Sequence, residues 1–312
     1  MPKCINNCYN LEGFWKNWHA SYNKWLVRKL LSWAWLTCLF FIPEMVAKSA
    51  ANAFQGAERV EALSLDMSGD GRTIQLSPKV FEGMDNLRLL SFFLRDGYWY
   101  KNPTSKLHLP QQGLEYLPNT LRLLHWDLYP SPSLPSNFRP ESIVYLKMHE
   151  SSLTQLWEGD NVHLVSLKVC DLSESKELIK IMDLSGVPNL EELNVGGCRS
   201  LVEIPSSIQR CRRLIKIIVS WCFNLCGFPG DLRLTSLEEV DLYNCPRITQ
   251  LPELPSTVKS LYLGRIGIKQ VQSSFREFLF RELSAVAGAI TITCLMGRKS
   301  GWLCDWTIRH QL

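Results

Sequence analysis

The residues with the greatest chemical potential in this chain are its cysteines. The 312-residue sequence contains 11 of them, a number that could form disulfides or bind zinc. However, the count is odd and no Cys-x-x-Cys pair occurs. The first 17 residues also lack the early apolar core of a secretory signal. We therefore expect reduced, intracellular cysteines rather than a disulfide framework.

Three cysteines recur at a regular interval, which raises the question of a metal site. Cys198, Cys222 and Cys245 each follow the last apolar residue of a repeated pattern by three positions. In successive turns, a small side chain at this position would hydrogen-bond neighbouring backbone and form a ladder. Because the interval equals the period of the repeat, we favour the ladder, and we expect no metal site and no cofactor.

The repeated pattern is apolar-x-x-apolar-x-apolar, and it occurs about nine times. Its apolar positions are Val60-Leu63-Leu65, Leu87-Leu90-Phe92, Leu121-Leu124-Trp126, Ile143-Leu146-Met148, Leu167-Cys170-Leu172, Leu190-Leu193-Val195, Leu214-Ile217-Val219, Leu237-Val240-Leu242 and Val258-Leu261-Leu263. From the third occurrence the starts lie roughly 21 to 24 residues apart, as in leucine-rich repeats. We interpret residues 96–106, within the longer interval between Leu87 and Leu121, as an inserted loop.

Each unit also carries a second apolar cluster that often precedes proline, as in Leu134-Pro135 and Leu251-Pro252. This pattern indicates a short strand followed by a return too irregular for a full helix. One repeat cannot bury its own apolar edge, so stacked neighbours share a continuous core. We predict an α/β leucine-rich-repeat solenoid (horseshoe) with a parallel concave β-sheet over residues 56–275. Short apolar helical segments would lie within the flanking residues 1–55 and 276–312.

Long stretches of the repeat region resemble plant intracellular immune receptors of the TIR–nucleotide-binding–leucine-rich-repeat class. The matching stretches include VEALSLDMSGDGRTIQLSPKVFEGM from Val60, LRLLHW from Leu121, SSLTQLWEG from Ser151, IMDLSGVPNLEELNVGGCRSLVEIPSSI from Ile181 and LPELPSTVKSLYL from Leu251. The chain has no TIR domain and no Gly-x-x-x-x-Gly-Lys-Ser/Thr loop for phosphates. The resemblance therefore implies the sensing and autoinhibitory part alone, without ATP binding.

Alternation along the strands identifies the side chains that face solvent on the concave sheet. The predicted protein-binding residues are Tyr145, Lys147, His149, Glu192, Asn194, Lys216, Ser220, Glu239, Asp241, Tyr243 and Tyr262. Ile218 and Ser260 face solvent on the same sheet by the same alternation. Aromatic residues mixed with both charge signs are typical of specific protein interfaces, and a merely solvated sheet is the alternative. The resemblance implies an effector, a guarded host protein or receptor domains as partner. Net charge is +4 and dispersed, which predicts no nucleic-acid partner.

The flanking segments resemble a second family, the membrane-bound O-acyltransferases of the glycerol-uptake-protein and Hedgehog-acyltransferase-like branch. The matching stretches are CYNLEGFWKNWHASYNKWLVR from Cys8, KLLSWAWLTCLFFIPEMVAKSAANAF from Lys29 and FLFRELSAVAGAITITCLM from Phe278. The resemblance implies a role for His19 in acyl transfer. The family's second histidine belongs to a segment that is missing between Arg28 and Lys29. We therefore predict no enzymatic activity, with His19 a vestigial candidate.

The terminal apolar runs also bear on location. A spanning helix needs about 20 apolar residues, whereas the run from Leu30 to Ile42 is shorter and Pro43 follows it. We expect a cytoplasmic protein whose ends could associate with a membrane. Residues 297–312 match neither family and are typical of a frame-shifted or intron-derived tail.

The hypothesis that unites these observations is a plant disease-resistance-type leucine-rich-repeat protein, a non-catalytic protein-recognition module in defence signalling. Two alternatives remain: a truncated membrane-bound O-acyltransferase-like protein, and a chimeric gene-model product without selected function.

Overall fold

The structure, a computed structural model, describes residues 60–68, 73–94, 106–110, 113–157, 163–230, 232–251, 253–267 and 307–309. All of them belong to one compact unit, Phe41–Leu312; the other unit is Met1–Phe40. His19 and the acyltransferase-like segments lie outside the described residues. Membrane association through these segments therefore stays a prediction. In the described ranges, no helix has the length and apolar character needed to cross a membrane.

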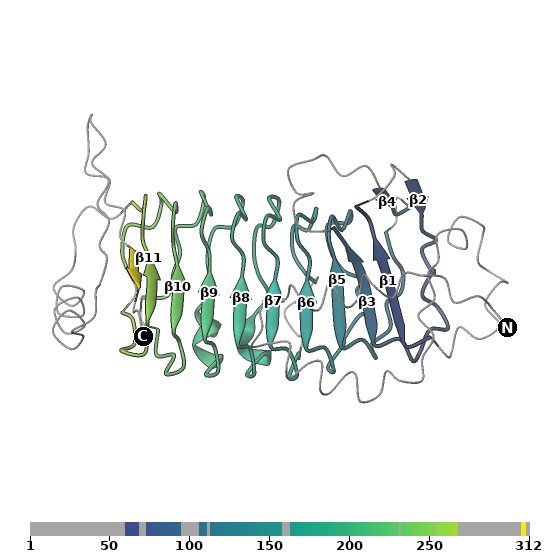
Figure 1. Ribbon diagram of the computed structural model, residues 1–312, viewed down its shortest axis with the longest axis horizontal. Coiled ribbons are helices and arrows are strands. Elements are labelled where there is room, and N and C mark those ends of the chain that lie inside the picture. The colour runs from purple at the N-terminus through teal and green to yellow at the C-terminus, as the bar shows by residue number, and fades with distance from the viewer. Residues whose placement is uncertain are drawn as a thin grey trace. The chain divides into compact units, whose positions relative to one another are not determined.

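The unit is built on a ten-stranded sheet with the order β1-β3-β5-β6-β7-β8-β9-β10-β11-β12 (Figure 1). The strands are β1 (Ala62–Asp66), β3 (Leu89–Phe93), β5 (Leu123–Trp126), β6 (Tyr145–Lys147), β7 (Val169–Asp171), β8 (Glu192–Asn194), β9 (Lys216–Ile218), β10 (Glu239–Asp241), β11 (Ser260–Tyr262) and β12 (Thr307–Arg309). From β1 to β11 each strand pairs in parallel with that of the next repeat. Strand β12 is antiparallel to β11. The predicted leucine-rich-repeat solenoid with a parallel sheet is confirmed.

The long interval between the second and third repeats contributes structure of its own. Strand β2 (Thr73–Gln75) pairs in parallel with β4 (Lys106–His108) in a separate two-stranded sheet. The amide of Leu76 extends this pairing by donating to the carbonyl of His108 at 2.9 Å. The predicted loop therefore ends in a strand at Lys106, while residues 95–105 lie outside the described ranges.

The return side of the repeats is irregular, as the sequence predicts. The helices found in the described ranges are the short 3-10 helices η4 (Leu184–Gly186) and η5 (Ser206–Arg210). The Asp183 side chain caps η4 by accepting a hydrogen bond from the amide of Ser185. Pro205 immediately precedes η5. Proline has no backbone N–H, and at the start of a helix this group would have no partner within the helix. Turns and bends therefore close most repeats.

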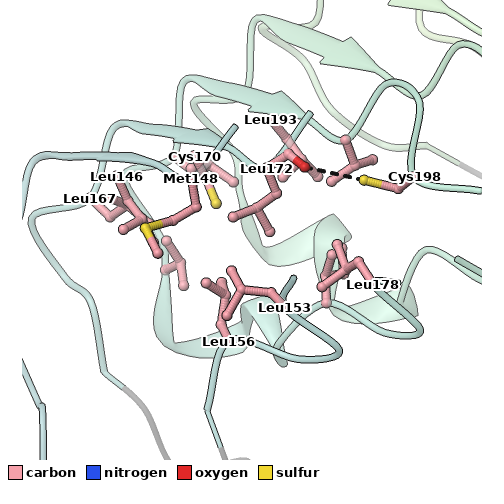
Figure 2. Close-up of a cluster of buried hydrophobic side chains, with 14 of the residues drawn as sticks. Leu146, Met148, Leu153, Leu156, Leu167, Cys170, Leu172, Leu178, Leu193 and Cys198 are labelled. Atoms are coloured by element: carbon pink, nitrogen blue, oxygen red, sulfur yellow. Dashed lines mark hydrogen bonds between the residues drawn. The ribbon is translucent and has the colours of Figure 1, made fainter. Parts of the chain in front are cut away.

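The core lies between the sheet and the return side, where each repeat contributes rows of buried side chains. The central row is Leu63, Leu90, Leu124, Leu146, Cys170, Leu193, Ile217, Val240 and Leu261. Figure 2 shows return-side Leu153, Leu156 and Leu178 together with Leu146 and Leu172 of the sheet in one cluster. Each buried leucine contributes about 1.5–3 kcal/mol relative to an exposed one. Because every repeat shares its core with its neighbours, the strand positions are held in register along the array.

Candidate functional site

The turn that follows each strand from β5 to β11 contains one residue with left-handed backbone geometry. Six of these are not glycine and have φ between 51° and 62°: Leu128, Glu150, Glu174, Trp221, Asn244 and Arg265. Gly197 occupies the same position with φ 76°. We call these seven residues the turn column. Left-handed geometry costs an L-residue roughly 1–2 kcal/mol, so something must hold it in place.

A hydrogen bond between repeats holds the turn column. The amide of Glu174 donates to the carbonyl of Gly196 at 2.7 Å, and that of Trp221 donates to Tyr243 at 2.8 Å. These bonds prolong the pattern of the parallel sheet past the end of each strand. The turn column therefore presents its side chains at a fixed spacing along one edge of the sheet.

From Glu150 to Asn244, the residue after each turn-column position is a buried serine or cysteine that donates to a backbone carbonyl, which confirms the prediction for the three cysteines. The thiol of Cys198 donates to the carbonyl of Leu172 at 3.2 Å (Figure 2). Cys222 and Cys245 donate to Val195 and Val219 at 3.1 and 3.0 Å. Ser175 occupies the same position one repeat before Cys198 and donates to Met148 at 3.0 Å. The cysteines of the ladder are therefore structural donors.

The protonation of these thiols agrees with that role. Burial raises the pKa of Cys245 to about 12 and raises those of Cys198 and Cys222 well above their usual value. A protonated thiol can donate to a carbonyl, whereas a thiolate cannot. Among the described residues, no group of three or more His, Cys, Asp or Glu side chains is arranged to hold a metal ion.

The outer sheet face consists of the strand residues that alternate away from the core, together with the residue just before each turn column. From β5 to β11 these residues form three rows across the sheet. They are Leu123, Tyr145, Val169, Glu192, Lys216, Glu239 and Ser260; His125, Lys147, Asp171, Asn194, Ile218, Asp241 and Tyr262; and Asp127, His149, Ser173, Gly196, Ser220, Tyr243 and Gly264. All eleven residues predicted to bind a partner lie on this face.

Nine of those eleven side chains keep partial exposure, but Tyr145 and Ser220 are each only 9% exposed. The expectation that alternation alone brings these two to solvent is wrong. Tyr145 lies between Leu123 and Val169 of the adjacent strands, both buried, so the neighbours cover it. Ser220 is close to Asp241, to which it hydrogen-bonds. The exposure of Tyr145 and Ser220 is therefore set by the neighbouring side chains and not by the side of the sheet on which they lie.

Two of the predicted binding residues also build turns. The side-chain oxygen of Asn194 accepts from the amide of Gly196 at 3.0 Å, and that of Asp241 accepts from Tyr243 at 2.9 Å. Asp171 accepts from the amide of Ser173 in the same way. Such bonds two residues along the chain are a known use of Asn and Asp at turns. These oxygens help to position the turn column, which reduces their share in recognition.

The remaining charges on the later strands are paired across the sheet. The ammonium group of Lys216 lies 3.3 Å from a carboxylate oxygen of Glu239 on the adjacent strand. Both side chains are partly exposed, so the pair contributes about 0–1 kcal/mol to stability. A partner that approaches this face meets an ordered dipole rather than separate mobile charges.

A polar cluster is buried at the earlier strands. His125 Nε2 lies 2.9 Å from Asp127 Oδ1, while Asp127 Oδ2 accepts from the amide of Leu94 at 2.9 Å. Burial acts to raise the pKa of Asp127, but the charge and hydrogen bond of His125 outweigh it, and the pKa is lowered. For His149, in contrast, burial disfavours the charged form and is the main cause that lowers its pKa to about 4. His149 is therefore neutral at pH 7.

Sequence reasoning missed Trp221, a turn-column residue that is 45% exposed. Its ring centroid lies 6.1 Å from that of Phe223 and 5.8 Å from that of Tyr243. The guanidinium carbon of Arg199 lies 5.6 Å from the centre of the Phe223 ring. We call Trp221, Phe223 and Tyr243 the turn aromatic patch. The available signal was a tryptophan two positions after the last apolar residue of a repeat, where the other turn-column residues are Leu, Glu, Gly, Asn or Arg.

Comparisons with known proteins match this repeat region. No protein-family model matches the chain. The chain is 37% identical over 221 residues to disease resistance protein RPP2A of Arabidopsis thaliana, covering 71% of this chain and 16% of that protein. It is likewise 37% identical over 221 residues to disease resistance protein RML1A of the same plant, covering 70% and 21%. With disease resistance protein RRS1, also from this plant, the identity is 33% over 238 residues, covering 76% and 15%.

The chain thus spans between 15% and 21% of the length of these relatives. Among solved structures, a leucine-rich-repeat protein of Leptospira interrogans aligns with a TM-score of 0.30 and 19% identity, covering 74% of this chain and 79% of that one. These comparisons give no support to an acyltransferase resemblance of the flanking segments.

Proposed function

Because its relatives over the repeat region are plant disease resistance proteins, we propose that this protein is a non-catalytic recognition module of plant defence. It binds another protein through the outer sheet face. The observation that carries this proposal is the stretch from β8 to β11. There the face bears partly exposed aromatic and charged side chains that the core does not need.

Several reactive groups of the described residues have structural roles, which supports a non-catalytic function; Cys226 differs, as an exposed free thiol. The ladder cysteines are buried, protonated donors to backbone carbonyls. His125 and Asp127, a pair that could act as acid and base, are at most 3% exposed, so a substrate cannot reach them. Partly exposed outer-face residues such as Glu192, Lys216 and Tyr262 instead suit contacts with a protein surface.

The partner belongs to one of three classes: a pathogen effector, a host protein that the defence system monitors, or the signalling domains of a disease resistance protein. All three would meet the chain in the cytoplasm. The chain spans 16% of RPP2A and 21% of RML1A, and the proposal concerns the matched repeat region.

Binding of the purified full chain to a panel of identified proteins tests the proposal. The panel contains pathogen effectors and the part of disease resistance protein RPP2A outside the matched region, and biolayer interferometry measures affinity. The exchange Lys216→Glu with Glu239→Lys keeps the ion pair but reverses the charge pattern of the face. We expect at least one saturable complex that this exchange weakens about tenfold, equivalent to about 1.4 kcal/mol.

Lys180→Glu is the matched control, because Lys180 is exposed on the return side between β7 and η4. It should leave the affinity unchanged. If no panel member binds saturably, or if both variants lose affinity equally, recognition through the outer sheet face is refuted.

A further inference from the structure

The turn aromatic patch combines exposure with an unfavourable backbone geometry. Trp221 is 45% exposed and has φ 62°, a region that bulky L-residues seldom adopt. Glycine would fit this position without cost, as Gly197 does one repeat earlier. The fold therefore has no need for a tryptophan here. Trp and Tyr are the residue types that contribute most at the centres of protein interfaces.

Arginines surround the patch. Arg199 lies over Phe223, Arg247 donates to the Asn224 side chain at 3.1 Å, and Arg265 follows Asn244 in the turn column. All three arginines are exposed, and none forms an ion pair with a carboxylate among the described residues. We call Arg199, Arg247 and Arg265 the arginine rim. Three guanidinium groups close to aromatic rings attract carboxylates and have planar donors to bind them.

The adjoining strands decide which kind of macromolecule fits. Glu192, Glu239 and Asp241 lie on the outer sheet face beside the patch. A nucleic-acid backbone that reached the arginine rim across this face would be repelled by these carboxylates. A peptide can place its acidic residues at the rim alone and its apolar side chain on the rings. The charge pattern therefore favours a protein segment over nucleic acid.

From this arrangement we propose that the turn aromatic patch and the arginine rim dock an acidic segment of a partner protein that carries an aromatic or large aliphatic anchor. The anchor packs on Trp221 between Phe223 and Tyr243, and the acidic residues pair with the rim. This rests on the proposed function and moves the centre of the interface from the strands to the turns that follow β8 to β11.

Selection of peptides on the full chain tests the proposal without a known partner. A phage-displayed library of random 12-residue peptides is selected on the purified protein. The most enriched peptide is then synthesised, and fluorescence polarisation measures its affinity. We expect the enriched sequences to combine Asp or Glu with Trp, Phe or Leu. Substituting its acidic residues by Asn and Gln should weaken binding at least fivefold, and rising salt should weaken it as well.

The variant Trp221→Gly separates binding from folding. It removes the ring but relieves the left-handed backbone, so the melting temperature should stay equal or rise while peptide affinity falls at least tenfold. Arg199→Gln with Arg247→Gln should weaken binding about fivefold and flatten its salt dependence. The control Ile179→Ala removes another exposed apolar side chain, 53% exposed on the return side, and should leave affinity within twofold.

Three outcomes overturn the inference. Enriched peptides without acidic residues, wild-type affinity in Trp221→Gly, or tighter binding of a 12-nucleotide oligouridine would each contradict it. If the Lys216/Glu239 exchange abolishes peptide binding and Trp221→Gly does not, the proposed function stands and the interface centre lies on the strands. If neither peptides nor the protein panel bind, both proposals fail.

Discussion

From β5 to β7 the first row of the outer sheet face is apolar and buried, whereas from β8 to β11 it is charged or polar and partly exposed. Leu123, Tyr145 and Val169 occupy this row in the earlier strands, and Glu192 and Lys216 continue it in the later ones. The backbone pairing is the same parallel register throughout. The core rows fix the fold, and the outer rows are free to take different roles.

The two halves therefore differ in what their outer side chains do. In the earlier half the first row and the His125–Asp127 pair form a second buried layer, so substitutions at these positions should act on stability. In the later half they present paired charges and the turn aromatic patch, so substitutions there should act on binding. Each of the following experiments can separate the halves or show that the division is false.

The largest expected effect is on stability in the earlier half. Leu123→Ala should lower the free energy of unfolding by about 3 kcal/mol, because it removes a buried side chain and leaves a cavity. Glu239→Ala, in the same row of the later half, should change it by less than about 1 kcal/mol. Urea denaturation followed by circular dichroism measures both. Equal losses in the two variants would show that the halves do not differ in this way.

A smaller loss in the free energy of unfolding should appear when pH falls. Since the pKa of His149 is about 4 in the folded protein, the unfolded chain takes up a proton near pH 6.5 before the folded one does. Stability is therefore lost as pH falls from about 6.5 to about 4, by about 2 kcal/mol. The lowered pKa of Asp127 adds a further loss below about pH 4, as this carboxylate is protonated.

Melting temperatures between pH 8 and pH 3.5 measure this dependence. In His149→Gln the slope between pH 6.5 and pH 4 should become shallower, while the loss that comes from Asp127 remains. If the variant and the wild type have parallel profiles, the burial of His149 does not govern acid sensitivity.

The smallest expected effect on stability concerns the ladder. Its side chains are serine in the earlier half and cysteine in the later half, but both donate to backbone carbonyls. Cys222→Ser keeps a donor at the position that Ser175 fills earlier, so stability should change by less than about 1 kcal/mol. Cys222→Val removes the donor and leaves the carbonyl of Val195 without this bond, at a cost of about 1–2 kcal/mol. Thermal denaturation of the two variants compares them. A greater loss for serine than for valine would mean that packing, not hydrogen bonding, defines the ladder.

The sequence is most informative where the period repeats. The apolar positions, the parallel strands and the cysteine ladder follow from the period, because one geometry must hold in every repeat. Thus Cys198 and Cys245 could be assigned as hydrogen-bond donors before any contact was known. The pairing of β2 with β4 falls outside the period, so the sequence pattern does not predict it and indicates only a loop over residues 96–106.

Exposure and the candidate site were less predictable. Alternation gives the direction of Tyr145 but not the size of the buried residues beside it, Leu123 and Val169. Trp221 escaped notice because alternation stops where the strand ends. The hydrogen bonds of the sheet continue past the end of β9 at Ile218 as far as Trp221, and the left-handed backbone there turns a side chain outward in a way that a period of two cannot express.

Strand β12 has a consequence for self-association. The open edge of a parallel sheet offers unpaired amides and carbonyls that can template pairing with another chain. At the β11 edge, Thr307–Arg309 pairs with these backbone groups as an antiparallel strand. A further parallel repeat, whether from this chain or from a second copy, cannot extend the sheet beyond β11 while β12 is in place. Loss of these three residues by proteolysis would convert this end of the solenoid into an adhesive surface.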